Sequence, residues 1–315
     1  MSTDQAKPRE HERVPQHFTA RITADGSSGW PVEAGKYRLI ASWACPWAHR
    51  VILTRSLMGL QEAIPLAIVD PVQEMIDGEY HWVFSEEHGG PGGKDPVLGI
   101  HALREAYFKA EPGYTGGVSV PGLVDVASGK LVSNDFERLT LDLNTEWKAL
   151  HREGAPDIYP EALRPEIDAV AKEIYQDVNV GVYRAGFAKT QATYDRAVKA
   201  LFARLDALEE RLSTRRYLVG DQITEADLRL WPTLIRFDPV YHGHFKCNIR
   251  QIRDYPALWG YTRDLYQTPG FSETVNFEHV KRHYYATHDF VNPTRIVAHG
   301  PDPELLLTPH GRESL

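Results

Sequence analysis

Apolar residues in the first half of the chain form short strand-like runs around one helical pattern. Residues 36–42 are a β-prone run, and residues 63–69 are another. Between them, residues 46–60 show apolar positions spaced for one helical face. Those positions are Val51, Leu53, Leu57 and Leu60. The pattern therefore predicts a strand, a helix and a second strand in that order.

The next stretch, residues 70–117, is long and irregular, with a short helix expected over residues 100–109. Such a length without regular structure is usually functional or mobile. Residues 118–124 are typical of a strand, although they contain Pro121. A proline inside a strand indicates an edge, a bulge or a cis peptide bond.

A turn and a short paired strand over residues 131–133 follow, and Asn134 or Asp135 is suited to cap a helix running to about residue 150. The order β-α-β-β-β-α predicts a small α/β domain of thioredoxin-like type over residues 36–150. Residues 1–35 are rich in proline, glycine and polar residues, which indicates an extended N-terminal arm.

The second half, residues 151–315, shows only helical patterns after a proline-rich linker, which predicts an all-α domain with a C-terminal extension. The expected helices cover residues 166–183, 191–212, 225–237 and 255–266. Thr224 and Asp227 have the spacing of a capping box, and Ile223 and Leu228 that of the hydrophobic staple. Asp227 is therefore interpreted as structural rather than catalytic.

Cys45 lies at the joint between the first strand and the first helix, directly before Pro46. Proline is favoured at the first helical position, so Cys45 is the expected N-cap. The free N–H groups and the positive end of the helix dipole then favour thiolate over thiol at this sulfur. Because thiolate is the nucleophile, the sequence places the chemistry at Cys45, against the alternative of a small cysteine that merely packs.

Composition limits the class of protein. A length of 315 residues favours about two domains, and the net charge of −8 argues against a general nucleic-acid binder. Two cysteines, Cys45 and Cys247, make no disulfide framework, which favours a reducing compartment. The charged N-terminus resembles no signal peptide, and no apolar run has the length of a membrane span. We expect a cytoplasmic protein.

Several long motifs, in order, resemble those of the glutathionyl-hydroquinone reductases, the Xi class of glutathione transferases. The resemblance covers about residues 37–301. The motifs are ACPWAHR (44–50), NVGVYRAGFA (179–188), TEADLRL (224–230), TLIRFD (233–238), YHGHFKCN (241–248) and KRHYYATH (281–288) with Asn292 and Pro293.

This resemblance implies a homodimeric enzyme that acts on small quinol conjugates by reductive dethiolation. The Cys45 thiolate attacks the sulfur of a thiol–hydroquinone thioether, and a second thiol releases the resulting mixed disulfide. Cys247 could be mistaken for a resolving partner, but packing is its more economical interpretation. No metal is expected, because the histidines lack metal-ligand spacing. They are His242, His244, His283 and His288.

Substrate roles follow the matching motifs. Tyr183 and Tyr284 resemble the phenols of the aryl site, with Tyr175 and Tyr241 as weaker candidates. On the thiol side the matching residues are Trp82, Val120, Pro121 and Asp135. A cis Pro121 is expected close to Cys45, where the Val120 backbone can pair with the cysteinyl part of the thiol.

Three substitutions depart from the family pattern. An arginine is replaced by Gly117, and a Glu-Ser pair by Asp135 and Phe136. Hydrogen bonds to charged groups contribute roughly 1.5–3 kcal/mol each, so losing two weakens glutathione binding by about two to four powers of ten. The co-substrate is then either glutathione or a neutral sugar thiol such as mycothiol, whose sugar could stack on Phe136 or Trp82.

Three hypotheses remain open: this reductase with an unusual thiol, a general glutathione transferase or disulfide reductase, and a non-catalytic binding module on the same fold. The intact surroundings of Cys45 argue against the third, because a scaffold needs no activated thiol.

Overall fold

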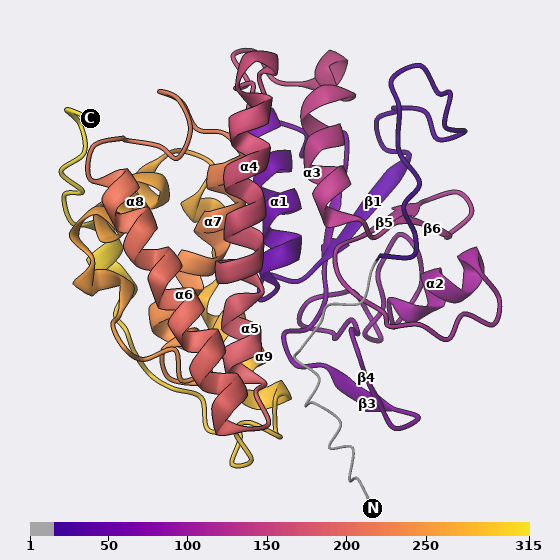
Figure 1. Cartoon of the computed structure of the whole chain (residues 1–315). Coiled ribbons are helices and arrows are strands. Elements are labelled where there is room, and N and C mark those ends of the chain that lie inside the picture. Colours follow the sequence, from indigo (N-terminus) through magenta and orange to yellow (C-terminus); the bar gives the residue numbers. More distant parts are fainter. Residues whose placement is uncertain (1–15) are drawn as a thin grey trace, which may run out of the picture.

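The N-terminal half is built on a four-stranded sheet in the order β2-β1-β5-β6 (Figure 1). The computed structural model describes residues 16–315. β1 pairs in parallel with β2 and antiparallel with β5, and β5 pairs antiparallel with β6. All five residues of the central strand β1 are buried. The strands are β1 (Tyr37–Ala41), β2 (Leu66–Ile68), β5 (Gly122–Asp125) and β6 (Leu131–Ser133).

Two helices of this half, α1 and α3, stand side by side between the sheet and the second half of the chain (Figure 1). A third, α2, contacts β6 at the other side of the sheet. A small hairpin of β3 and β4 lies apart from the main sheet. The bounds are α1 (Pro46–Met58), β3 (Glu74–Ile76), β4 (Glu79–His81), α2 (Arg104–Ala110) and α3 (Phe136–Thr145).

The second half is helical. Its helices are α4 (Arg164–Ile174), α5 (Gly181–Gly186), α6 (Gln191–Leu212), α7 (Glu225–Arg236), α8 (Pro256–Gln267) and α9 (Phe277–Thr287). α7 packs against both α1 and α4, so it lies at the junction of the two halves (Figure 1). This arrangement confirms the predicted fold class, an α/β thioredoxin-like part followed by an all-α part. No helix within residues 16–315 is long and apolar enough to cross a membrane.

Several element bounds differ from the predictions for local reasons. β5 begins at Gly122, so Pro121 precedes the strand instead of interrupting it, consistent with the missing N–H of proline. The helix expected up to residue 150 ends at Thr145. The single helix expected over 166–183 is divided by a π-helical turn, Tyr175–Asn179. The hairpin β3–β4 and the helix α9 were not predicted.

The capping box at the start of α7 is present as expected. The carboxylate of Asp227 accepts hydrogen bonds from the Thr224 N–H at 2.7 Å and the Thr224 hydroxyl at 2.9 Å. It also accepts from the Leu218 N–H at 3.0 Å and the Tyr261 hydroxyl at 2.7 Å. A fully buried carboxylate with four donors fixes the chain around it, which supports a structural role for Asp227.

Residues 16–35, the described part of the predicted arm, pack on the α/β part. Thr19 forms a β-bridge with Ser133, and Arg21 pairs with Asp142 of α3 at 2.7 Å. The remainder of the arm, residues 1–15, lies outside the described residues. The division at residue 150 remains a proposal, supported by the change from mixed to purely helical elements after that point.

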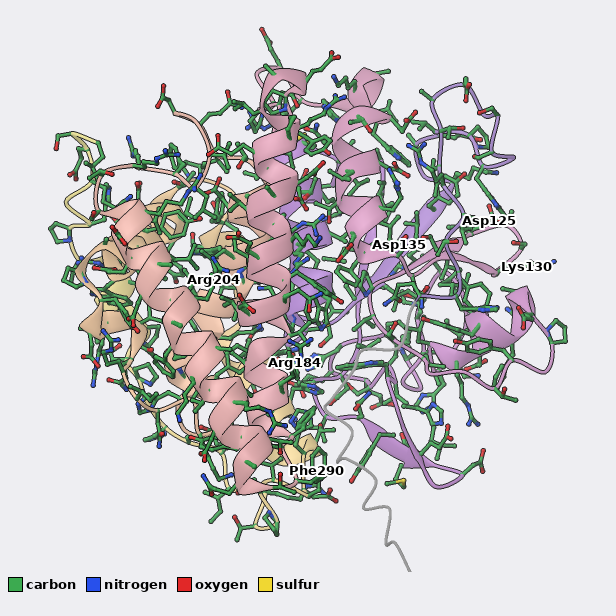
Figure 2. The ribbon with its side chains drawn as sticks, viewed as in Figure 1. Asp125, Lys130, Asp135, Arg184, Arg204 and Phe290 are labelled. Carbon is green, nitrogen blue, oxygen red and sulfur yellow. The ribbon has the colours of Figure 1, made fainter. Side chains whose placement is uncertain are left out.

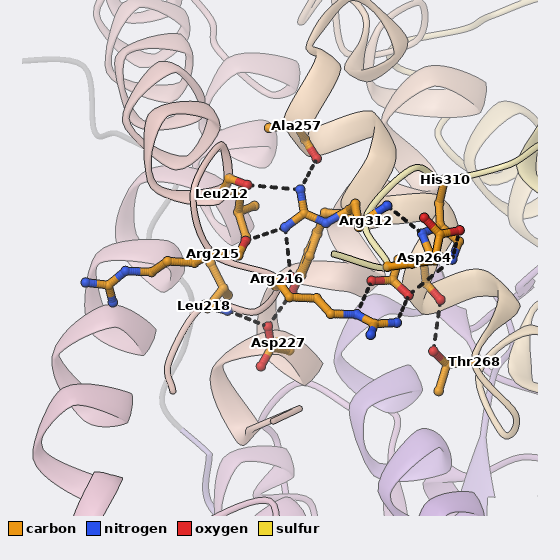
Figure 3. Close-up of polar contacts among 12 residues, drawn as sticks. Leu212, Arg215, Arg216, Leu218, Asp227, Ala257, Asp264, Thr268, His310 and Arg312 are labelled. Atoms are coloured by element: carbon orange, nitrogen blue, oxygen red, sulfur yellow. Dashed lines mark hydrogen bonds and ion pairs between the residues drawn. The ribbon is translucent and has the colours of Figure 1, made fainter. Parts of the chain in front are cut away.

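The C-terminal extension is anchored by Arg312, which is 3% exposed (Figure 3). Its guanidinium donates to the carbonyl oxygens of Leu212 at 2.9 Å and Arg216 at 2.8 Å, and also to that of Arg215. These carbonyls lie at and just after the C-terminal end of α6, where backbone acceptors lack helical partners. The extension is therefore held against the helical half.

Candidate active site at the start of α1

Cys45 is the N-cap of α1, as predicted, with Pro46 at the first helical position. Its backbone is extended, with φ −78° and ψ 119°, and its carbonyl accepts from the His49 N–H at 3.0 Å. The Cys45 residue is 9% exposed, and its sulfur lies 3.6 Å from the Val120 carbonyl oxygen. The Val120–Pro121 peptide bond is cis. The predicted cis proline beside the cysteine is thus confirmed.

A buried arginine from α7 holds the loop that leads to Cys45. The guanidinium of Arg236 donates to the carbonyl oxygens of Ala44 at 2.9 Å and Trp43 at 2.8 Å. It also donates to the Pro232 carbonyl at 2.8 Å and to His49 Nδ1 at 2.9 Å. Arg236 is 1% exposed, and these contacts use four of its five N–H donors. The helical half therefore sets the position of the nucleophile.

His49 completes this connection. Burial, together with the charge of Arg236, lowers the pKa of His49 well below its usual range, so the imidazole is neutral. Because Nδ1 accepts from a guanidinium, the proton is on Nε2, which lies 2.8 Å from the Thr274 hydroxyl. The neutral ring thus links Arg236 to the segment before α9 through two hydrogen bonds, one at each ring nitrogen.

A cleft of about 280 Å³ opens beside Cys45, at the junction of the two halves. Its walls are mainly aromatic and come from α1, α5, α9 and the segments before β5 and after β4. The lining residues are Cys45, Pro46, Trp47, Trp82, Val118, Ser119, Val120, Val180, Tyr183, Phe187, His283, Tyr284 and His288. Such a cleft fits a flat, largely apolar ligand with a few polar groups.

Three tyrosines form a hydrogen-bonded chain at this cleft. The hydroxyl oxygens of Tyr183 and Tyr284 lie 2.6 Å apart, and those of Tyr241 and Tyr284 lie 3.0 Å apart. Burial raises the pKa of Tyr241 to about 12 and the pKa values of Tyr183 and Tyr284 well above 10. All three phenols therefore remain protonated at neutral pH and can donate hydrogen bonds.

The structure separates the four tyrosine candidates. Tyr183 and Tyr284 line the cleft, whereas Tyr241 is fully buried behind Tyr284. Tyr175 does not line the cleft, and its ring packs 5.9 Å from that of Trp47.

The predicted thiol-side residues are likewise divided. Trp82 and Val120 line the cleft. Asp135 lies at the lower end of α3 in Figure 2 and caps that helix, accepting from the Arg138 N–H at 3.0 Å. Phe136 is 2% exposed and lies outside the cleft lining, with its ring 5.1 Å from that of Trp47. A sugar therefore finds no open face on Phe136, in contrast to the expectation.

Sequence reasoning missed several residues of this site. Trp47 lies within the motif that contains Cys45. Its ring stacks on that of Tyr183, with centroids 6.2 Å apart. His283 and His288 were considered only as metal ligands, and no cluster of three metal-ligating side chains occurs among residues 16–315. The available signal was Tyr284, since His283 directly precedes it and His288 follows it by four residues, about one helical turn. Arg236 gave no signal beyond its place in a motif.

Cys247 is buried and is paired with no other cysteine. Burial raises the pKa of this thiol, so it remains protonated. Its nearest hydrogen-bond acceptor is the Phe245 carbonyl at 3.9 Å. This environment supports packing as its role.

Comparison with known proteins agrees with this geometry. A family model for the glutathione S-transferase C-terminal domain matches residues 191–264. The chain is 43% identical to the glutathionyl-hydroquinone reductase YqjG of Escherichia coli K-12 over 308 residues, covering 96% of this chain and 92% of that protein. It is 44% identical to the glutathionyl-hydroquinone reductase PcpF of Sphingobium chlorophenolicum, covering 87% and 85%.

Solved structures give the same result. A glutathione transferase from Gordonia bronchialis superposes with a TM-score of 0.90 at 53% identity, covering 94% of this chain and 90% of that one. The glutathione-bound structure of E. coli YqjG superposes with a TM-score of 0.88 at 42% identity, covering 95% and 96%. The fold defines a glutathione transferase, and its cleft is lined by an N-capping cysteine. Within that class, the chain belongs to the glutathionyl-hydroquinone reductase family, the Xi class.

Proposed function

We propose that this protein removes a low-molecular-weight thiol from thiol–hydroquinone conjugates through a mixed disulfide at Cys45. The observation that carries the proposal is the N-capping cysteine, which opens into an aromatic cleft lined by neutral phenols. A thiolate at a helix N-terminus is a suitable nucleophile toward sulfur, and the phenols are suitable donors to a quinol oxygen.

The proposed reaction has two steps. The Cys45 thiolate attacks the conjugate sulfur, the carbon–sulfur bond breaks, and its electron pair goes to the ring carbon, which takes up a proton. The hydroquinone leaves, and Cys45 holds the thiol as a disulfide. A second thiolate attacks that disulfide, releasing the symmetrical disulfide and the Cys45 thiolate. The net reaction consumes one free thiol: its sulfur and the conjugate's sulfur lose two electrons in forming the disulfide, and the ring carbon gains them.

Tyr183 is proposed to supply the hydrogen bond or proton that the departing ring needs, with Tyr284 as its immediate partner. Tyr241 supports Tyr284 from behind. Trp82 and Val120 are proposed to hold the thiol, with Val120 presenting backbone groups beside the cis Pro121. Asp135 and Phe136 are proposed to act indirectly, through the start of α3 and the support of Trp47.

Replacing Tyr183 by phenylalanine is expected to lower the first-order rate of hydroquinone release by roughly 10²-fold, as for the loss of a positioned proton donor. The phenol pKa values are raised, so the wild-type rate should show no phenol titration between about pH 6 and 9. Tyr285→Phe is the matched control, because its hydroxyl lies outside the cleft and donates to Pro239. Equal rates in wild type and Tyr183→Phe would remove Tyr183 from the reaction.

The identity of the thiol is a separate proposal: a neutral, hydroxyl-rich thiol such as mycothiol is favoured over glutathione. Gly117 has no side chain to offer where the family has an arginine, and an added Cβ there meets nothing within 4 Å, so a longer side chain has room. The Asp135 carboxylate is engaged with α3, and Phe136 offers no polar atom. The relatives named above are called glutathionyl reductases, so glutathione remains the alternative.

Gly117→Arg tests this proposal directly. We expect the variant to reduce a Cys45 mixed disulfide with glutathione roughly 10-fold faster at low thiol concentration, since a hydrogen bond to a carboxylate contributes about 1.5–3 kcal/mol. Gly117→Gln is the control for side-chain size without charge. Phe136→Ser is a poorer test, because losing the buried ring leaves a cavity costing about 3–5 kcal/mol.

The unmodified protein supplies the decisive comparison. Competing glutathione and mycothiol for the Cys45 mixed disulfide should favour mycothiol. If the unmodified protein prefers glutathione at low concentration, and Gly117→Arg does not change that preference, other residues hold the charged ends of glutathione. This proposal is then wrong.

A general transferase or disulfide reductase remains the alternative activity, and a binding module without catalysis remains the third. Turnover of an aryl thioether separates them from the proposed reductase. A general transferase or disulfide reductase acts on small disulfides but not on the thioether, and a binding module acts on neither. A homodimer in the cytoplasm also remains proposed, and sedimentation at micromolar concentration tests the oligomeric state.

A further inference from the structure

His283 of α9 is a second polar group that faces the same cleft. It is 8% exposed, and its ring stacks on Trp82 with centroids 4.8 Å apart and planes inclined by 25°. On the other side its neighbour Tyr284 belongs to the phenol chain, with the two rings 5.3 Å apart. The imidazole is therefore held between the thiol side and the aryl side of the cleft.

The hydrogen-bonding state of His283 is fixed by one contact. Its Nδ1 lies 2.8 Å from the Pro71 carbonyl oxygen, which can only accept, so Nδ1 carries the proton. Burial lowers the pKa of His283 to about 4, so the ring is neutral at pH 7. Nε2 is then an acceptor only, and no group within residues 16–315 makes a hydrogen bond to it.

The charged and titratable groups around His283 are compatible with this state. The Thr287 hydroxyl lies 3.5 Å from the same Nδ1, and both His244 and Arg236 disfavour a positive charge on the ring. His288 differs, because its Nδ1 lies 3.3 Å from His244 Nε2. Either of those two nitrogens can be the donor, so His288 can present a donor or an acceptor to the cleft.

We propose that His283 is a specificity-determining residue that selects the reduced, hydroxyl-bearing ring over the oxidised quinone. This inference rests on the proposed function for the identity of the ring. A hydroquinone has two O–H groups: one oxygen accepts from the phenol chain at Tyr183 or Tyr284, and the other hydroxyl donates to His283 Nε2. A quinone has only carbonyl oxygens, so at His283 two acceptors face each other.

The chemical consequence is protection of the nucleophile. An unsubstituted quinone position adds thiolates, so a cleft that accepted quinones as readily as hydroquinones would alkylate Cys45. An acceptor-only group at one end of the cleft penalises the quinone, because a polar site rejects a ligand that cannot complete its hydrogen bonds.

The test measures binding of tetramethylhydroquinone and tetramethylquinone to the Cys45→Ser protein by anaerobic calorimetry. These fully substituted rings carry no position for thiol addition. We expect the hydroquinone to bind at least about 10-fold more tightly than the quinone. The hydroquinone makes one hydrogen bond to Nε2, whereas the quinone places an acceptor opposite that acceptor. In the added change His283→Phe, which keeps a stacking ring, the ratio should fall to near one, mainly through weaker hydroquinone binding.

Two further variants keep the result interpretable. His283→Gln places an amide that both accepts and donates near the position of Nε2, so quinone binding should tighten while hydroquinone binding is retained. His279→Phe is the matched control: this buried histidine of the same helix lies outside the cleft lining, so the change should leave the ratio unchanged. If His283→Phe does not fold, the ratios in the His283-intact protein and in His283→Gln still decide the matter.

Equal affinities for the two rings in the His283-intact protein, or the same ratio in folded His283 variants, would overturn the inference. Because binding is measured without turnover, the outcome is separable from the proposed reaction. Selective binding without dethiolation by the wild-type protein would contradict the proposed function alone, and dethiolation with unselective binding would contradict only the role of His283.

Discussion

Replacing Cys45 by serine should lower release of hydroquinone from a thiol–hydroquinone conjugate by roughly 10³-fold or more, the scale expected when a nucleophile is removed. A serine hydroxyl cannot form the mixed disulfide, and no other thiol is poised to replace it. The fold should survive, because serine is a favoured N-cap and the change is nearly isosteric. Circular dichroism and a melting curve check the fold, and stopped-flow detection of hydroquinone checks the rate.

Cys247→Ala is the matched control for Cys45→Ser. The Cys247 thiol is buried and remains protonated, so its removal should leave hydroquinone release within about twofold, apart from a modest loss of stability. Turnover retained in Cys45→Ser, or lost in Cys247→Ala with the fold intact, would mean that the nucleophile is misassigned.

Arg236→Leu should lower stability by about 3–5 kcal/mol, because several buried acceptors lose their donor and each unsatisfied buried group costs about 1–3 kcal/mol. The change leaves the carbonyl oxygens of Trp43 and Ala44 and the His49 ring without their donor in a buried region. The Cys45 loop then loses its attachment to α7, so the rate should also fall in the fraction that remains folded. Denaturant titration measures the first effect and single-turnover kinetics the second.

Arg204→Leu is the matched control for Arg236→Leu. In Figure 2 this arginine lies on α6, and it pairs with Glu173 at 2.7 Å and Asp177 at 3.0 Å at the protein surface. Surface pairs contribute about 0–1 kcal/mol, so a small change is expected. Similar losses in both variants would show that the Arg236 contacts add nothing particular to the Cys45 loop.

The part of the site nearest to Cys45 could be predicted from the sequence because its signals are local. Cysteine followed by proline at a strand–helix joint places the thiol at the N-cap, and the structure confirms it. The capping box at Thr224 and Asp227 is local in the same way. The 22-residue helix α6 was predicted with its observed bounds, because its apolar stripe is long and regular.

The rest depends on contacts between residues far apart in the chain. Arg236 reaches Ala44 across 192 positions, and His283 takes its tautomer from Pro71 across 212 positions. No periodicity reports such contacts. Phe136 shows the reverse error: its place in a motif suggested an open ring face, but Trp47 packs against it. Phe136 is buried partly by Trp47, a residue that the sequence analysis had not assigned to the site.

The most direct test of the proposed mechanism is a single turnover without free thiol. The reduced protein is mixed with one equivalent of the conjugate, quenched by alkylation, and analysed by intact mass and peptide mapping. We predict one equivalent of released hydroquinone, with the mass of the thiol added by a reducible bond to the peptide that contains Cys45. Hydroquinone release with an unmodified Cys45, or an aryl group attached to that sulfur, would contradict the mixed-disulfide mechanism.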